Sequence, residues 1–168
     1  LPIMIYNNRI AYNVDLMPDS FLQLADVEHI IAVKESSHDS RRMTDMINAC
    51  GERYRMFCGV DDLVLENVLF GAVGWVAGLV NCFPRESVQL FDLASNGKIN
   101  EAVQLYRWFM PLLHLDVDVK LVQMIKLANQ IMDEGSEWVR RPRMPLEGDE
   151  RRAVIATVEA ALKNRPNL

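Results

Sequence analysis

The feature that most constrains the fold is a regular alternation of short apolar runs with segments of helical spacing over the first 97 residues. The apolar runs are Ile3–Tyr6, Ile30–Val33, Tyr54–Cys58 and Gly74–Val80. They lack a clean apolar–polar alternation, which is typical of strands covered on both faces. Strands that alternate with helices through short loops form βαβ units. We therefore predict an α/β protein with four right-handed units and a parallel sheet.

Helix signals follow each run. Pro18 and Pro84 stand where proline is favoured, in the first turn of a helix. A helix beginning at Ser40 is expected to end at Gly51, because glycine commonly terminates helices. Asp61 or Asp62 is expected to cap the next helix.

The pattern changes after Gly97. Residues 99–115, 117–134 and 149–162 are predicted to be helices, the first of them kinked or divided by Pro111. Residues 140–145 contain two prolines and should be extended. Four βα units are half of an eight-fold barrel. We thus predict the second half of a (β/α)8 barrel over 1–97 and a C-terminal helical extension, packed on that barrel, over 98–168.

Charge and hydropathy exclude several classes of partner. The net charge of −5 leaves no basic face for nucleic acid, and the densest cationic stretch, residues 140–143, is interrupted by Pro142. The longest apolar run, Phe70–Val80, is too short to span a membrane and contains three glycines. We expect neither a nucleic-acid nor a membrane partner.

Cysteine usage points to a reducing compartment. The three cysteines, Cys50, Cys58 and Cys82, are widely spaced and form no CxxC pair. Reduced thiols in a cytoplasmic protein fit this pattern better than disulfides or a zinc site. His114, Asp116 and Asp118 lack a second histidine at ligand spacing, so we interpret them as helix-end residues and expect no metal.

The chain begins with LPIMIYNN, which is already strand-like and lacks an initiating Met. We therefore expect it to be the later part of a longer protein. A half barrel would leave two unpaired strand edges, so the chain by itself should associate.

Lys34 is the main candidate for chemistry. It ends an apolar run and shares strand parity with Ile30 and Ala32, and active groups of parallel sheets gather at the carboxyl ends of strands. A lysine held against apolar neighbours loses solvation of its cation, which lowers its pKa and frees the amine to attack a carbonyl. The commoner alternative is a lysine whose stem merely covers the strand end.

Tyr6 and the glycine-rich segments surround the same predicted sheet edge. Tyr6 ends the first run, where its phenol could relay protons or simply remain hydrated. The segments GVDD at 59–62 and GAVGWVAG at 71–78 would allow close approach of a ligand. Neither matches a GxGxxG or GK[ST] pattern, so no nucleotide site is expected.

Taken together, these residues resemble the second half of the dihydrodipicolinate synthase and N-acetylneuraminate lyase family. The matching motifs are YN at 6–7, VKESS at 33–37, GVDD at 59–62, GAVGWVAGLVNCFP at 71–84 and RPRMPL at 141–146. The resemblance implies that Lys34 forms a Schiff base with a 2-oxo acid and that Tyr6 relays protons, with no cofactor. It also implies that the substrate is lined by Gly59, Val76, Ala77 and Gly78.

The sequence departs from the synthase subgroup after Tyr6. Where those enzymes resemble YNxPxRTG, this chain has Arg9 at the proline position and Ala11 at the arginine position. The segments GWVAGLV and YRWFMPLLHLD are more similar to relatives that deaminate a hydroxypyrroline carboxylate. Dihydrodipicolinate synthase and sugar-acid dehydratase remain alternatives, as does a non-catalytic barrel fragment.

The resemblance also implies partners and limits. The substrate would be a small 2-oxo acid or imine, and the protein would be a homo-oligomer, either a dimer or a tetramer. The family's Thr-Thr pair that holds the substrate carboxylate belongs to the earlier half of the barrel and has no counterpart in this chain. We therefore expect the 168-residue chain alone to have negligible turnover.

Overall fold

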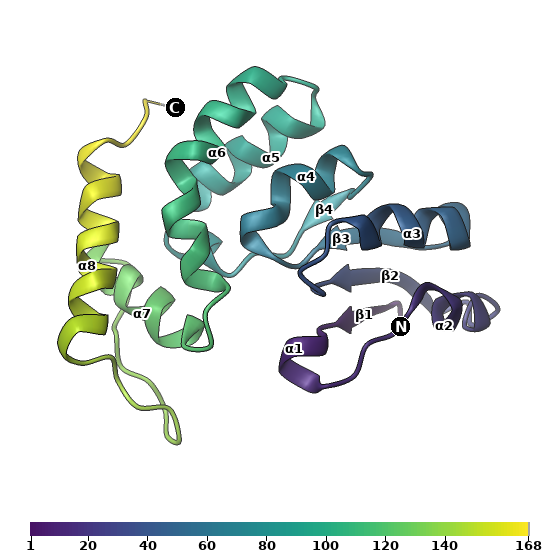
Figure 1. Cartoon of the computed structure of the whole chain (residues 1–168), viewed down its shortest axis with the longest axis horizontal. Coiled ribbons are helices and arrows are strands. Elements are labelled where there is room, and N and C mark those ends of the chain that lie inside the picture. The colour runs from purple at the N-terminus through teal and green to yellow at the C-terminus, as the bar shows by residue number, and fades with distance from the viewer. Residues whose placement is uncertain (168) are drawn as a thin grey trace. The chain divides into compact units, whose positions relative to one another are not determined.

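The computed structural model describes residues 1–167. They form two compact units, Leu1–Ala77 and a second unit from Gly78 onward. Figure 1 shows the first unit in purple to blue and the second in teal to yellow. The predicted domain boundary after Gly97 stays a prediction; the two units divide earlier because helix α5 (Pro84–Ser95) packs on helix α6 (Ile99–Leu113).

The first unit contains a four-stranded parallel sheet in chain order, which confirms the predicted α/β class. Its strands are β1 (Ile3–Asn7), β2 (Ile30–Glu35), β3 (Arg55–Cys58) and β4 (Gly74–Trp75). β1 lies at one edge and β4 at the other. Strands β1 to β3 lie within a residue or two of the predicted runs, because their apolar composition alone identifies them.

The fourth strand is shorter than predicted. The apolar run Gly74–Val80 forms a strand only at Gly74–Trp75, and Leu79–Asn81 forms a 3₁₀ turn. After Val76 donates its N–H to the Cys58 carbonyl at 2.9 Å, the backbone turns away from the sheet. An apolar run indicates burial, and burial alone does not distinguish a strand from a buried turn.

Three helices of the first unit, α2 (Pro18–Gln23), α3 (Arg41–Cys50) and α4 (Val64–Leu69), cover one face of the sheet. The short helix α1 (Arg9–Tyr12) follows β1 and has no buried residue. α2 packs on α3, and the core between helices and strands contains Phe21, Val33, Met43, Met46 and Met56. Pro18 occupies the first turn of α2, and Gly51 ends α3 with a φ of 56°, as predicted.

The predicted cap of α4 is wrong. That helix begins at Val64 with Leu63 as its N-cap, while Asp61 and Asp62 lie in a preceding 3₁₀ turn. Asp61 is fully buried and accepts a hydrogen bond from Trp75 Nε1 at 3.0 Å. Its carboxylate is therefore tied to the neighbouring strand β4.

The described residues of the second unit form helices and connecting segments, and none of them forms a strand. Besides α5 and α6 the helices include α7 (Leu121–Ile131) and α8 (Gly148–Lys163), and α8 packs on both α6 and α7. α6 continues through Pro111 and ends two residues later at Leu113, so of the two predicted effects of this proline the division does not occur. A turn interrupts the segment that was predicted to be extended: at residues 140–143 the Arg143 N–H donates to the Arg140 carbonyl at 3.2 Å. None of the described helices is long and apolar enough to cross a lipid bilayer.

Candidate functional site

Two rows of residues cross the carboxyl ends of the strands. Tyr6, Lys34, Phe57 and Gly74 are paired in register, and the next row consists of Asn7, Glu35, Cys58 and Trp75. Successive strand residues point to opposite faces. The first row therefore lies on one face of the sheet and the second row on the other, which α2, α3 and α4 cover.

Lys34 and Tyr6 are brought into contact in the first row. The Lys34 amine lies 4.1 Å from the centroid of the Tyr6 ring. Lys34 is half-buried, and Tyr6 is 39 % exposed. The face of an aromatic ring attracts a cation at this distance, so the contact helps to keep the Lys34 side chain beside the phenol.

The loop after β1 completes the surroundings of Tyr6. Asn8 donates a hydrogen bond from Nδ2 to the Tyr6 hydroxyl at 2.9 Å. The ring of Tyr12, in α1, meets the Tyr6 ring edge-on with centroids 5.7 Å apart. The orientation of the phenol is thus set by two residues of one short loop.

Gly59 lies directly against the lysine stem. A Cβ at this position would stand 2.8 Å from Lys34 Cε and 2.0 Å from Ser36 Oγ. Only glycine allows this approach. Ser36 and Ser37 are each 1 % exposed, and their hydroxyls have no hydrogen-bond partner among residues 1–167.

The other predicted lining residues are distributed over both units. Val76 follows β4 and is exposed, and Ala77 ends the first unit half-buried. Gly78 belongs to the second unit, where a Cβ would stand 1.8 Å from Asp116 Oδ1. Of the predicted site residues, the structure brings Tyr6, Lys34 and Gly59 together at the carboxyl ends of neighbouring strands.

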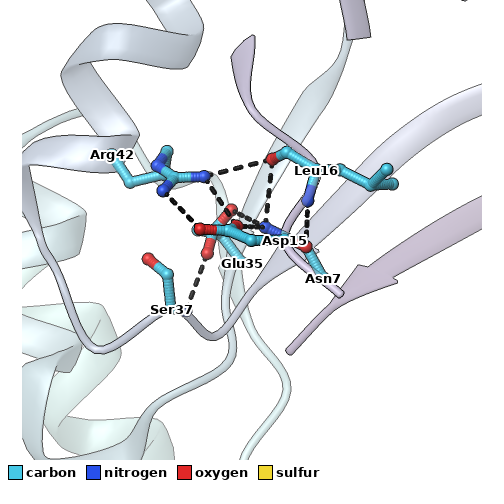
Figure 2. Close-up of polar contacts among 6 residues, drawn as sticks. All are labelled: Asn7, Asp15, Leu16, Glu35, Ser37 and Arg42. Atoms are coloured by element: carbon cyan, nitrogen blue, oxygen red, sulfur yellow. Dashed lines mark hydrogen bonds and ion pairs between the residues drawn. The ribbon is translucent and has the colours of Figure 1, made fainter. Parts of the chain in front are cut away.

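Sequence reasoning missed a buried polar network behind this pair. Figure 2 shows Asn7 at its centre, on the helix-covered face. Asn7 Nδ2 donates to Glu35 Oε2 at 3.0 Å and to Asp15 Oδ1 at 3.1 Å. Glu35 Oε1 accepts the backbone N–H of Ser37 at 2.7 Å. Asn7 and Glu35 are 2 % and 3 % exposed.

Arg42 extends the network from helix α3. Its Nη1 and Nη2 donate to the two oxygens of Asp15, each at 3.0 Å. These hydrogen bonds lower the pKa of the Asp15 carboxyl, and burial opposes them. The same contact with Asp15 raises the pKa of Arg42, and the nearby charge of Glu35 adds to this.

The sequence did contain a signal for the network. Asn directly follows Tyr6 and Glu directly follows Lys34, on neighbouring strands. Once the register of β1 and β2 is known, a pair on one face implies a pair on the other. Asp15 and Arg42 carry no such signal, because their approach depends on the path of a loop and on the placement of α3.

The remaining candidates lie at a helix end or are free thiols. Residues 1–167 contain no group of three or more His, Cys, Asp or Glu side chains that could hold a metal ion. Asp118 accepts the N–H of Lys120 at 2.7 Å beside the helix end at His114–Asp116, as expected of helix-end residues. Cys50, Cys58 and Cys82 are free thiols, as predicted.

Comparison with known proteins identifies relatives over nearly the whole chain. Residues 1–161 match the dihydrodipicolinate synthetase family. A 4-hydroxy-tetrahydrodipicolinate synthase of Thermomicrobium roseum is 30 % identical over 159 residues, covering 94 % of this chain and 52 % of that protein. One of Geotalea daltonii is 27 % identical over 163 residues, covering 95 % of this chain and 55 % of that protein.

Solved structures agree with the sequence relatives. The crystal structure of a putative dihydrodipicolinate synthetase from Pseudomonas aeruginosa superimposes with a TM-score of 0.88 at 26 % identity. The match covers 96 % of this chain and 56 % of that one. The chain therefore spans about half the length of the relatives it matches.

Proposed function

The chain belongs to the dihydrodipicolinate synthetase family, and on this premise we propose that Lys34 forms a Schiff base with a 2-oxo acid or a related imine. The observation that carries the proposal is the contact between the Lys34 amine and the Tyr6 ring, 4.1 Å apart at the carboxyl ends of paired strands. The contact places a phenol, a group that can transfer protons, directly beside the amine.

The chemistry follows from the amine. The neutral nitrogen attacks the keto carbon of the substrate, the addition product takes up one proton and loses water, and a protonated imine remains. This imine accepts the electron pair of a bond broken at the adjacent carbon. C–C cleavage, loss of water and loss of ammonia all become accessible through the same intermediate. The Tyr6 phenol, whose ring contacts the amine, can transfer the protons that these steps require.

For the overall reaction we propose deamination of a hydroxypyrroline carboxylate to a 2-oxo semialdehyde. Arg9 and Ala11, which replace the proline and arginine of the synthase pattern, support this choice. The synthase reaction is the second candidate, and the names of the curated relatives support it equally. Sugar-acid dehydration uses the same lysine and is the third.

We further propose that the four strands are half of an eight-stranded barrel, consistent with the coverage of about half of each relative. On this proposal, the groups that hold the substrate carboxylate lie outside this chain. The complete enzyme would act as a cytoplasmic homo-oligomer, and this chain alone as a non-catalytic fragment.

Borohydride trapping tests the Schiff base. The complete protein, of which this chain is proposed to be one half, is incubated with pyruvate and reduced with borohydride. The modified peptide is then identified by mass spectrometry. We expect one adduct, on Lys34, and none in Lys34→Arg, which keeps the charge but cannot form the imine. Lys126→Arg is the matched control and should be modified like the wild type. A folded wild type without an adduct on Lys34 would refute the proposal.

The released product separates the three reactions. With a hydroxypyrroline carboxylate as substrate, a deaminase releases ammonia, which a coupled assay detects. A synthase consumes pyruvate instead, and a dehydratase forms a new 2-oxo acid from a sugar acid without releasing ammonia.

A further inference from the structure

We infer that Asn7, Glu35, Asp15 and Arg42 are positioning residues that hold Tyr6 against Lys34 from the opposite face of the sheet. This inference rests on the proposed function, because it assigns the network a task in the reaction of Lys34. None of the four side chains lies in the row that contains the reacting amine.

The strand register gives the first reason. Tyr6 is paired with Lys34, and Asn7 with Glu35, in consecutive positions of β1 and β2. The hydrogen bond from Asn7 Nδ2 to Glu35 Oε2 therefore joins the two strands one residue beyond the catalytic pair. Any slip or separation of the strand ends would have to break this buried bond.

The composition of the network gives the second reason. Glu35 is 3 % and Arg42 is 7 % exposed, and taking charged groups out of water costs free energy that their attraction often does not recover. Apolar side chains would pack between strand and helix without that cost. A buried polar cluster in which each member meets a partner is better suited to fixing relative positions than to adding stability.

The third reason is the loop that the network clamps. Leu16 N–H donates to Asn7 Oδ1 at 3.0 Å, and the Leu16 carbonyl accepts from Arg42 Nη1 at 3.1 Å. Residues 15 and 16 are thereby held to the strand end and to α3, as Figure 2 shows. The loop between Asn7 and Asp15 carries Asn8 and Tyr12, the two residues that orient the Tyr6 phenol.

These contacts connect the network to the amine by a short physical route. Loosening residues 15–16 releases one end of the loop that sets the phenol, and loosening Asn7 releases the strand end that carries it. A displacement of about 1 Å in a reacting group can lower a rate by about 100-fold. Loss of the network should therefore slow imine formation without removing the amine.

The first test is Glu35→Gln in the intact protein. The glutamine keeps the shape, but its NH₂ must face either Asn7 Nδ2 or the Ser37 N–H, both of which are donors. We expect borohydride trapping of pyruvate on Lys34 to slow by about 10- to 100-fold. Glu137→Gln is the matched control: like Glu35, its carboxylate accepts a hydrogen bond from a side-chain amide, here Gln130 Nε2, and it accepts a further one from Arg151, but it lies in the second unit. It should leave trapping unchanged.

A second measurement does not depend on the substrate. Competitive labelling with acetic anhydride, followed over a series of pH values and mapped by mass spectrometry, reports the reactivity of each lysine amine. In Glu35→Gln we expect the Lys34 profile to change and those of Lys98 and Lys126 to stay as in the wild type. A purely structural role would alter the unfolding midpoint and leave the Lys34 profile of the folded protein unchanged.

Asp15→Asn is the milder companion variant, because the Asp15 side chain is 24 % exposed and its loss should be compatible with folding. We expect the same change in the Lys34 profile at smaller amplitude. Wild-type trapping rate and labelling profile in either folded variant would overturn the inference while leaving the proposed function intact. A wild type that forms no adduct would instead refute the proposed function, and the labelling would still decide whether the network positions Lys34.

Discussion

At the scale of single residues, burial separates the three thiols into two classes. Cys58 is fully buried, accepts a hydrogen bond from Asn67 Nδ2 at 3.1 Å, and has its pKa raised to about 12 by burial. Burial likewise raises the pKa of Cys82 to about 12. Cys50 is only half-buried, and burial raises its pKa while Arg53 opposes the effect. Cys50 is therefore both the most accessible of the three thiols and the one with the largest thiolate fraction, so it should be the most reactive.

We predict that a disulfide reagent at pH 8 modifies one thiol of the native chain, Cys50. Cys58 and Cys82 should react about a thousandfold more slowly than in denaturant, because a thiol of pKa about 12 is almost wholly protonated at pH 8. Since burial favours the protonated form, unfolding releases protons as the pH rises above 9, and stability falls between about pH 9 and 12. In Cys50→Ser, the rapid modification of the native chain by the disulfide reagent should disappear. A second fast thiol in the native chain would contradict the prediction.

At the scale of elements, the loop after β3 meets β2 at a glycine. In Gly59→Ala the new Cβ would fall on the stem of Lys34, at 2.8 Å from Cε and Cγ, so the lysine must move. We predict a loss of about 1–3 kcal/mol in the free energy of unfolding, as for other overpacked sites, together with slower trapping at Lys34. Chemical denaturation of the chain measures the first effect, and reduction with borohydride in the intact protein measures the second.

Gly135→Ala is the control for this substitution. Its Cβ would meet the Asn129 side chain at 3.4 Å, an ordinary van der Waals distance. The stability and the trapping rate should both stay close to the wild-type values. Equal effects of the two substitutions would show that Gly59 has no special relation to Lys34.

At the scale of the whole molecule, the free edge of β1 is the main liability of the chain. β1 is the first strand of the sheet, and its residues Ile3, Met4 and Tyr6 are 49 %, 41 % and 39 % exposed. An exposed apolar edge strand offers unpaired N–H and C=O groups to another chain.

We predict that the purified 168-residue chain associates at micromolar concentration, and that Met4→Lys shifts it toward monomer, because an inward-pointing charge on an edge strand opposes pairing. Analytical ultracentrifugation over a concentration series measures this. Val119→Lys makes the same kind of exchange at a position that is 92 % exposed and outside the sheet, and it should not change association. A wild-type chain that stays monomeric at about 100 μM would show that the edge is not sticky.

The sequence by itself determined the α/β class, the first three strands, most of the helices, and the placement of Lys34 and Tyr6 at neighbouring strand ends. These features depend on local signals: apolar runs, proline and glycine positions, and the parity of residues along a strand. The same local signals failed where the outcome depended on distant groups. The fourth run left the sheet early, α6 was not divided at Pro111, and Leu63 rather than an aspartate is the N-cap residue of α4.

Only the tertiary structure decided which side chains support the pair. Asn7 meets Glu35 because two strands are in register, and Asp15 meets Arg42 because a loop returns to α3, 27 residues away along the chain. Polar contacts of this kind are short-ranged and directional, so they exist only when backbone positions far apart in sequence are set to within a fraction of an ångström. Hydrophobic patterning is coarse enough to be recognised in the sequence, whereas such contacts are specified by the folded chain as a whole.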